Sequence, residues 1–432
     1  MRARAATTSS QVMGKLTRRV YNHHVEVFFL MMGLWLVVAV ALGSEDLARA
    51  GALLVVLVVV SAVAATVEHH LAHRNLQVRR TITPSTLSVG RPGHVTVHIT
   101  PMPGHRAQLG RLRLRERAAV ELSNGQPIRA TVTRRPRELA LAYGVHASRR
   151  GRWPIGPITA TVGDPFGLFT RSQTLGRAVD VAVWPRVVDL DVPPGGLSSD
   201  PDTAARGART PSADDASLRV YRPGDDLRRV HWASSAKRGT LLVRNDERSG
   251  KRPVTVLLDL PVDDVGVEWS ISLAASIALA MLRSGHPVRF LPTGDPGTAG
   301  PRLTQVHAHP PRNDAAVASL LDATIDLAGP VTSEQGEAQL LDAAEVLATH
   351  DPSETVIAVV GPMTPQARTA LAAAVGPGHG WAVIRTHDAS TAETRTTQDT
   401  RTALLHAGWW TSLASPTSDL TEAWDSLVRT RP

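Results

Sequence analysis

Residues 254–260 read Val-Thr-Val-Leu-Leu-Asp-Leu, an almost unbroken apolar run that ends beside the carboxylate of Asp259. The run lacks the alternation of a half-exposed strand and is typical of a strand buried on both faces of a parallel sheet. Thr355–Val360 is a second run of this kind, and shorter strands are predicted at Pro287–Leu291 and Trp381–Arg385. Together these segments predict the strands of one parallel sheet.

Helical patterns lie between and after these strands. They are predicted at Val267–Arg283, Ala315–Leu327, Glu337–Ala348, Pro365–Ala374 and Leu420–Val428. Regular alternation of strands and helices is the pattern of a doubly wound α/β fold. We therefore predict such a domain over residues 253–432.

A different pattern fills the chain from Leu76 to about Pro194. Short alternating segments such as Val95–Thr100 are interrupted by turns rich in Gly, Pro and Asn-Gly. Without a convincing helix, this pattern predicts an antiparallel, β-sandwich-like domain over residues 68–194. The fold class expected for the whole chain is thus α+β, with several domains.

Arginine alternates with leucine at residues 111–115, which predicts a strand with one charged face. Such a face is most often simply solvated. The sharper hypothesis is attraction to the anionic inner leaflet of a membrane, at about 1 kcal/mol per basic residue close to the surface.

The composition excludes several kinds of site. No cysteine occurs among the 432 residues, which excludes disulfides, Cys-ligated zinc, iron–sulfur clusters and thiol catalysis. Only Lys15, Lys237 and Lys251 among the 47 basic residues are lysine, and this bias resembles genomic base composition more than nucleic-acid binding. Because aromatic residues make up only 4% of the chain, stacking platforms for bases are few, and we expect no nucleic-acid partner.

Two uncharged apolar runs stand near the N-terminus, Val27–Gly43 and Gly51–Val67. A helix of 17 residues is about 26 Å long, which just crosses a bilayer core when the flanking residues reach the interfaces. The connector Ser44–Ala50 leaves room only for a tight reversal, so residues 25–67 predict a transmembrane hairpin in the lipid bilayer. The alternative is a cleaved signal peptide, since Ala39–Ala41 resembles a cleavage site.

Basic residues set the expected orientation of this hairpin. Five of them lie in the tail 1–24 and three more at Arg74, Arg79 and Arg80, whereas the connector carries only Arg49. The positive-inside rule then predicts a multi-pass protein of the cell membrane whose soluble domains lie in the cytoplasm.

The junction at residues 195–252 begins with a Gly-, Ser- and Pro-rich linker and continues into a dense polar run at 217–239. Pro223-Gly224 favours a tight turn. Asp225 or Asp226 is placed to cap a helix from Leu227 to about Lys237. The residues of interest in this run are Arg219, Tyr221, Pro223, Gly224, Asp225, Asp226, Arg228, His231, Trp232, Lys237 and Gly239.

This run resembles the signature of the domain of unknown function 58 family. In that signature an Arg/Tyr segment is followed by Pro-Gly-Asp-Asp and then by Arg. A His or Asp comes next, directly before Trp. The signature ends with Ser-Ala, a basic residue, any residue and Gly. A second fingerprint of the family, Asp-Pro-Phe-Gly-Leu-Phe, is present at Asp164–Phe169, and Val183–Pro185 also fits. The similarity extends to the hairpin, the β-rich domain and a C-terminal domain similar to von Willebrand factor type A domains.

The resemblance implies a role as a binding or assembly partner. Members of the family are typically found with MoxR-type AAA+ ATPases and often with membrane transglutaminase-like proteins. The implied role is a membrane-anchored, non-enzymatic adaptor that presents its type A-like domain to such an ATPase. The eleven signature residues would then contact the partner, and no catalytic residue or cofactor is expected.

Many type A domains bind a divalent cation through an Asp-x-Ser-x-Ser loop after the first strand. The residues that follow the first predicted strand of this chain can therefore be compared with that motif. Here Asp259 is present, but Pro261 and Asp263 occupy the two serine positions. Gly361-Pro362 follows the later strand, where an aspartate is expected. Asp259, Asp263 and Asp264 are therefore only weak candidates as ligands for a hard cation, and we expect no metal.

The alternative hypothesis is a hydrolase that uses Asp225, Asp226 and His231 as acid/base groups or metal ligands. No nucleophile accompanies these residues, and the aspartates can instead pair with neighbouring arginines. The sequence also lacks a phosphate-binding Gly-rich loop with its lysine. We therefore expect a protein without enzymatic activity.

Overall fold

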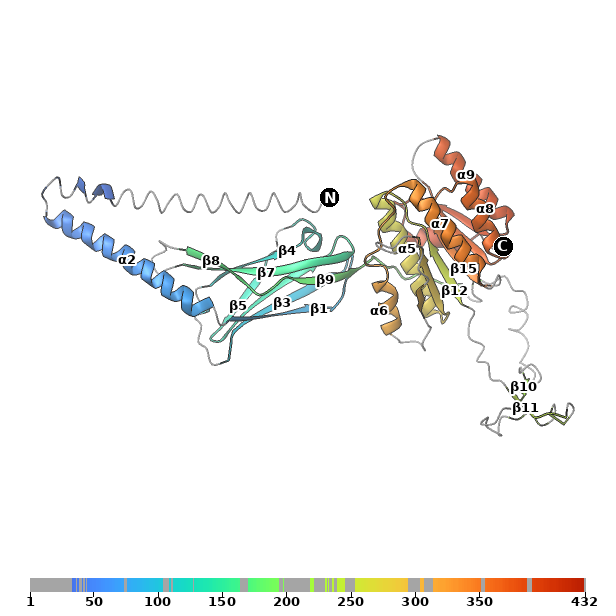
Figure 1. Cartoon of the computed structure of the whole chain (residues 1–432), viewed down its shortest axis with the longest axis horizontal. Helices are drawn as coiled ribbons and strands as arrows, with labels where there is room; N and C mark the ends of the chain where they lie inside the picture. The colour runs from blue at the N-terminus through green and yellow to red at the C-terminus, as the bar shows by residue number, and fades with distance from the viewer. Residues whose placement is uncertain are drawn as a thin grey trace. The chain divides into compact units, whose positions relative to one another are not determined.

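The structure is a computed structural model of the chain, and it divides into two compact units (Figure 1). The first unit comprises Met1–Ser148 and Trp153–Val181, and the second, the α/β unit, comprises Arg149–Arg152 and Ala182–Pro432. The structure describes residues 33–35, 37, 38, 41, 43, 45–73, 76–103, 109, 112–126, 128–163, 170–193, 197, 218–220, 230, 232, 235, 236, 239–244, 253–293, 304–306, 314–350, 354–386 and 391–430.

The first unit begins with helix α2 (Glu45–His73), which contains the second apolar run of the sequence. The predicted reversal at residues 44–50 is wrong for residues 45–50, because the helix already begins at Glu45. Glu45 and Asp46 stand in the first helical turn, where carboxylates are favoured by the helix dipole, and Arg49 pairs with Glu45 at 2.8 Å. These local interactions favour helix over loop.

The structure does not show both helices of the predicted hairpin. The run Val27–Gly43 lies largely outside the described residues. Among the residues that are described, only Val265–Arg283 forms a helix long and apolar enough to cross a membrane, and 89% of it is buried inside the α/β unit. That helix is therefore part of a protein core. Arg49–Ser61, within α2, is a shorter apolar stretch.

Two β-sheets follow α2, as the alternating pattern predicts. The first sheet has the order β1-β3-β6-β5, and all of its neighbouring strands are antiparallel. The second sheet has the order β2-β9-β7-β4, and β8 pairs with β7. Their bounds are β1 Leu76–Thr83, β2 Leu87–Ser88, β3 Pro92–Pro101, β4 Arg113–Ala118, β5 Thr131–Arg135, β6 Glu138–His146, β7 Gly151–Gly163, β8 Thr170–Leu175 and β9 Val179–Trp184.

The inward side chains of both sheets form the core of this unit. Val95, Val97 and Ile99 of β3 are fully buried, as are Ile155 and Ile158 of β7. The every-second-residue spacing on β3 is that of a strand with one buried face. A short 3-10 turn at Val120–Leu122 follows β4.

A buried ion pair joins the two sheets inside this core. Arg80 of β1 donates to the Oε1 atom of Glu116 of β4 at 2.7 Å, and its Nη1 donates to the carbonyl oxygen of Arg177 at 2.7 Å. Both side chains of the pair are less than one-tenth exposed. Burial, followed by the neighbouring Glu116 carboxylate, raises the pKa of Tyr143, so its phenol stays neutral.

The α/β unit contains a six-stranded sheet in the order β14-β13-β12-β15-β16-β17. All pairings are parallel except that of β14 with β13. The chain moves outward from β12 on one side, returns to β15 beside β12, and moves outward on the other, which is the doubly wound arrangement predicted. The strands are β12 Val254–Leu258, β13 Val288–Pro292, β14 Thr304–Val306, β15 Thr355–Val360, β16 Gly380–Arg385 and β17 Trp410–Ala414.

Each face of this sheet packs against helices, so alternate residues of one strand enter different cores. Val256 and Leu258 of β12 lie in one core with Trp424, whereas Leu257 lies in the other with Leu371. The continuous apolar runs are thus explained by burial on both faces. The helices are α5 Asp264–Arg283, α6 Asp314–Asp322, α7 Ser333–Ala348, α8 Pro365–Ala374, α9 Thr391–His406 and α10 Leu420–Val428.

Several element bounds differ from the prediction for local reasons. Helix α5 begins at Asp264 rather than Val267, because the carboxylate of Asp263 accepts from the amide of Gly266 and caps it. Helix α6 ends at Asp322 and not at Leu327. Helix α9 and strands β14 and β17 were not predicted, and α9 has a threonine-rich sequence of low helix propensity.

The residues before β12 also belong to the α/β unit. Val187, Val188 and Val192 pack against its core, and the indole nitrogen of Trp424 donates to the carbonyl oxygen of Asp191 at 2.7 Å. The α/β unit thus starts within β9, at Ala182, and the expected domain boundary at residue 194 stays a prediction.

Replacing Arg80 by methionine is expected to destabilise the first unit by about 3–5 kcal/mol, because the Glu116 carboxylate would remain buried without its partner. Hydrogen exchange of the β3 and β6 amides in the full chain measures this loss for the first unit alone. The exposed Arg113, changed in the same way, should cost less than about 0.5 kcal/mol. Equal protection in the two variants would contradict the prediction.

Candidate functional site

The carboxyl ends of β12 and β15 form the topological switch point of the α/β unit, because the chain winds away from them in opposite directions. In open α/β sheets this edge is where ligands bind. Asp259 directly follows β12, Gly361 directly follows β15, and Arg385 is the last residue of β16. Three polar groups from three strands therefore meet at this edge.

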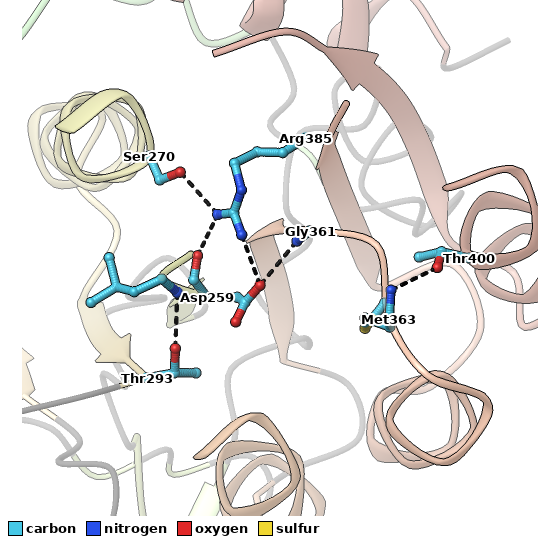
Figure 2. A network of polar contacts seen from close by, with 8 residues as sticks. Asp259, Ser270, Thr293, Gly361, Met363, Arg385 and Thr400 are labelled. Atoms are coloured by element: carbon cyan, nitrogen blue, oxygen red, sulfur yellow. Dashed lines mark hydrogen bonds and ion pairs between the residues drawn. The ribbon is translucent and has the colours of Figure 1, made fainter. Parts of the chain in front are cut away.

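Figure 2 shows that these groups form one connected network. The Oδ2 atom of Asp259 accepts a hydrogen bond from the amide of Gly361 at 3.0 Å and another from Nη2 of Arg385 at 3.0 Å. Nη1 of Arg385 donates to the hydroxyl of Ser270 on α5 at 2.9 Å, and it also donates to the carbonyl oxygen of Asp259. The network thus ties β12, β15 and β16 to α5.

Arg385 is enclosed by protein, with only 2% of its side chain exposed. Burial lowers the pKa of Arg385, while the Asp259 carboxylate acts in the opposite direction and favours the charged form. Because a guanidinium is protonated across the ordinary pH range, Arg385 places a fixed positive charge beside the Asp259 carboxylate. Its Nε atom is buried and has no hydrogen-bond partner within the described part of the chain.

Gly361 allows the guanidinium to approach the backbone at this point. A Cβ atom on this residue would lie 2.8 Å from Nη2 of Arg385 and 3.5 Å from Oδ2 of Asp259. Any larger side chain here would therefore push the arginine away from its carboxylate.

The weak metal candidates are engaged in other roles. Asp259 is paired with Arg385, and Asp263 caps α5, while the side chain of Asp264 lies outside the described residues. Across the described ranges, no group of three or more histidine, aspartate or glutamate side chains is placed to hold a metal ion. At Asp259 the arginine supplies the positive charge that a cation would otherwise bring, so these residues do not fit a type A metal site.

Only part of the signature run can be located. Arg219 lies in β10 (Leu218–Val220), which pairs in antiparallel fashion with β11 (Leu242–Arg244). Trp232 is helical and 65% exposed, whereas Val230 and Ser235 are buried. Gly239 has a φ of +69° and donates to the carbonyl oxygen of Ser235 at 2.9 Å, a helix-ending turn of the kind predicted.

The remaining signature residues lie outside the described part of the chain. They are Tyr221, Pro223, Gly224, Asp225, Asp226, Arg228, His231 and Lys237. The three groups of the hydrolase hypothesis are all among them, and the Asp164–Phe169 fingerprint also lies outside the described residues.

Sequence reasoning placed Asp259 at a strand end but assigned no role to Arg385. A signal was available, because an arginine closes the otherwise apolar strand Gly380–Arg385, whose residues are all buried. A buried charge at that position needs an oppositely charged partner. Asp259, near the end of the apolar run Val254–Leu260, is a candidate because it also lies at the carboxyl end of a buried strand.

Comparison with known proteins supports the family resemblance over part of the chain. Residues 217–394 match the family described as "Protein of unknown function DUF58". No curated protein matches the chain.

Solved structures show only weak likeness. A von Willebrand factor type A protein from Catenulispora acidiphila is 14% identical with a TM-score of 0.27, and the match covers 42% of each chain. The PilB minor pilin from Streptococcus sanguinis is 7% identical with a TM-score of 0.27, over 70% of this chain and 83% of that one. The filamin domain of Lin-41 is 14% identical with a TM-score of 0.15, over 24% of this chain and 90% of that one.

Replacing Arg385 by methionine is expected to cost the α/β unit about 3–5 kcal/mol of unfolding free energy, because it leaves the Asp259 carboxylate buried and uncompensated. Adding Asp259→Asn to this variant should restore part of the loss. Hydrogen exchange of the β12, β15 and β16 amides provides the measurement.

The matched control for this experiment is Arg368→Met. Arg368 pairs at 3.3 Å with Asp399, whose side chain is 65% exposed, so its loss should cost no more than about 1 kcal/mol. If both variants lost the same stability, the buried pair would not be what holds this edge of the sheet.

Proposed function

We propose that the chain is a membrane-anchored, non-enzymatic adaptor that presents its α/β unit to a cytoplasmic MoxR-type AAA+ ATPase. The observation that carries the proposal is the surface of α2. Among the side chains of α2 that the structure describes, seven large apolar ones are exposed, and four of them, Leu53–Val56, are consecutive and so point to all sides of the helix. Such a surface is unfavourable in water and favourable in hydrocarbon.

One narrow line of residues along α2 is buried. Gly51, Val58 and Ser61 are buried, at spacings that place them on one side of the helix. Small residues along such a line favour close packing of a second helix in a bilayer. The apolar run Val27–Gly43 is our proposed occupant, so that the two runs form the hairpin with both ends in the cytoplasm.

The chemistry of the α/β edge supports binding rather than catalysis. Asp259 is the carboxylate at the switch point, and its hydrogen bonds to Arg385 and Gly361 occupy the Oδ2 atom that would otherwise be available to hold a metal ion. The match to the DUF58 family over residues 217–394 adds support from resemblance. The proposed contact to the ATPase includes the signature run, in which Trp232 is 65% exposed. A membrane transglutaminase-like protein is proposed as a further partner.

Charged substitutions on the exposed side of α2 should release the protein from membranes. Val56→Asp and Val59→Asp together are expected to oppose insertion by about 5–7 kcal/mol, since an aspartate at the centre of a membrane helix costs about 2.5–3.5 kcal/mol. Alkaline extraction of membranes followed by detection of the full chain measures the effect.

Val331→Asp is the control, because Val331 is 83% exposed but lies in the α/β unit. It should leave the membrane fraction unchanged. Recovery of the Val56→Asp, Val59→Asp variant in membranes at the native level would contradict the anchor. Digestion of the C-terminal unit by protease added outside intact spheroplasts would contradict the orientation.

The ATPase contact predicts that a tagged full-length chain, purified from its native membranes, brings a MoxR-type AAA+ ATPase with it. Trp232→Ala should weaken the complex by about 2 kcal/mol, or roughly 30-fold in its dissociation constant, as expected for an exposed aromatic anchor. Leu405→Ala, which changes a 46% exposed apolar residue on α9, is the matched control. Equal capture with all three chains would rule out this surface as the contact.

A further inference from the structure

The outward face of the second sheet carries arginines and hydroxyls, which are in register at Arg113 and Arg115, and the β4–β7 register shifts at Arg117. On β4 the exposed residues are Arg113, Arg115 and Arg117, which alternate with the inward residues Leu114, Glu116 and Ala118. The predicted strand with one charged face is therefore present, although Arg111 lies outside the described residues. Within the part of the chain that the structure describes, no ion pair is formed by these three arginines.

Strand β7, which pairs with β4, and strand β8, which pairs with β7, extend this array with hydroxyl groups. Arg113 stands opposite Thr161 of β7, which stands opposite Ser172 of β8. The next row runs from Arg115 to Thr159 and Thr174. Directly opposed residues of antiparallel strands project from the same face, so each row presents one guanidinium and two hydroxyls. The hydroxyls of Thr161 and Ser172 lie 3.0 Å apart. We call these six residues, with Arg117, the Arg–hydroxyl face.

Within the described residues no carboxylate forms an ion pair with this face, although the exposed Asp180 of β9 lies in the same sheet. Glu116 is the only acidic residue in β4, β7 and β8, and it points inward, where it is paired with Arg80. Guanidinium and hydroxyl groups are the donors that bind phosphate oxygens, and rows two residues apart are separated by about 7 Å. The face is thus complementary to a surface with many phosphates rather than to a single small anion.

The chain itself places this face near such a surface. Helix α2 ends at His73 and β1 begins at Leu76, so only two residues separate the proposed membrane anchor from the first strand of the unit. We infer that the Arg–hydroxyl face binds the anionic phospholipid headgroups of the membrane in which α2 is anchored. This inference rests on the proposed function for the membrane location alone.

The test uses the full chain in vesicles and a single fluorescent label. Because the chain has no cysteine, Thr174→Cys gives a unique donor site on the face, and Ala142→Cys gives a control site on the outward side of the first sheet. The vesicles are either pure phosphatidylcholine or an equal mixture with phosphatidylglycerol, and both carry a headgroup acceptor dye. Energy transfer then reports contact of the labelled face with lipid.

We expect energy transfer from the Thr174 site to rise in the anionic vesicles and to fall again at about 1 M salt, where the screening length is about 3 Å. The variant Arg113→Gln, Arg115→Gln, Arg117→Gln should lower the equilibrium constant for contact between the face and the lipid about a hundredfold, because each arginine contributes about fivefold. The matched control removes the same charge from exposed positions in and beside β5 of the first sheet, by Arg129→Gln, Arg135→Gln, Arg137→Gln, and should change little. The Ala142 site should not respond to lipid composition.

Each other outcome has a defined meaning. Equal transfer in neutral and anionic vesicles, or an equal loss with both triple variants, would overturn the inference while leaving the anchor intact. Failure of the unmodified chain to float with either vesicle would instead contradict the proposed membrane anchoring. If duplex DNA removed the Thr174 signal and bound the chain tightly without vesicles, the face would be a nucleic-acid site and the lipid inference would be wrong. If inorganic phosphate alone abolished the contact at matched ionic strength, the site would be one for free phosphate.

Discussion

The attraction between the Arg385 guanidinium and the Asp259 carboxylate holds together the centre of the α/β unit. The two residues are 126 positions apart in the chain, and their contact fixes the ends of β12 and β16 relative to each other. A hydrogen bond from the Gly361 amide adds β15, and one to the Ser270 hydroxyl adds α5. Burying either charge alone would be strongly unfavourable, so the fold is stable only when both are placed correctly.

This pair also limits what the edge of the sheet can do. Switch points of open α/β sheets are suited to ligands because strand ends and loops leave polar groups unpaired there. In this chain the central carboxylate is already satisfied by an internal cation. The positive charge is permanent, whereas a metal site would exchange its ion with the solution. While this pair is intact, the Oδ2 atom of Asp259 is therefore occupied by the Arg385 guanidinium and the Gly361 amide.

Arginine serves two opposite purposes in the molecule. Arg80 and Arg385 are buried and paired with Glu116 and Asp259, where the forked guanidinium can satisfy several acceptors at once. On the outward face of β4 the same residue type is exposed and forms no ion pair within the described residues. A bias towards arginine that looks merely compositional thus includes both core contacts and a patterned surface.

The sequence by itself determined the elements whose signal is local. Unbroken apolar runs at Val254–Leu260 and Thr355–Val360 identified buried parallel strands, and alternation identified the two antiparallel sheets. Only the tertiary structure decided which charges meet. Arg385 and Asp259 become neighbours through sheet order, and Glu116 turns inward to Arg80 while Arg115 beside it turns outward. These ion pairs form between segments that are distant in the chain, and a single sequence contains no periodic pattern that predicts them.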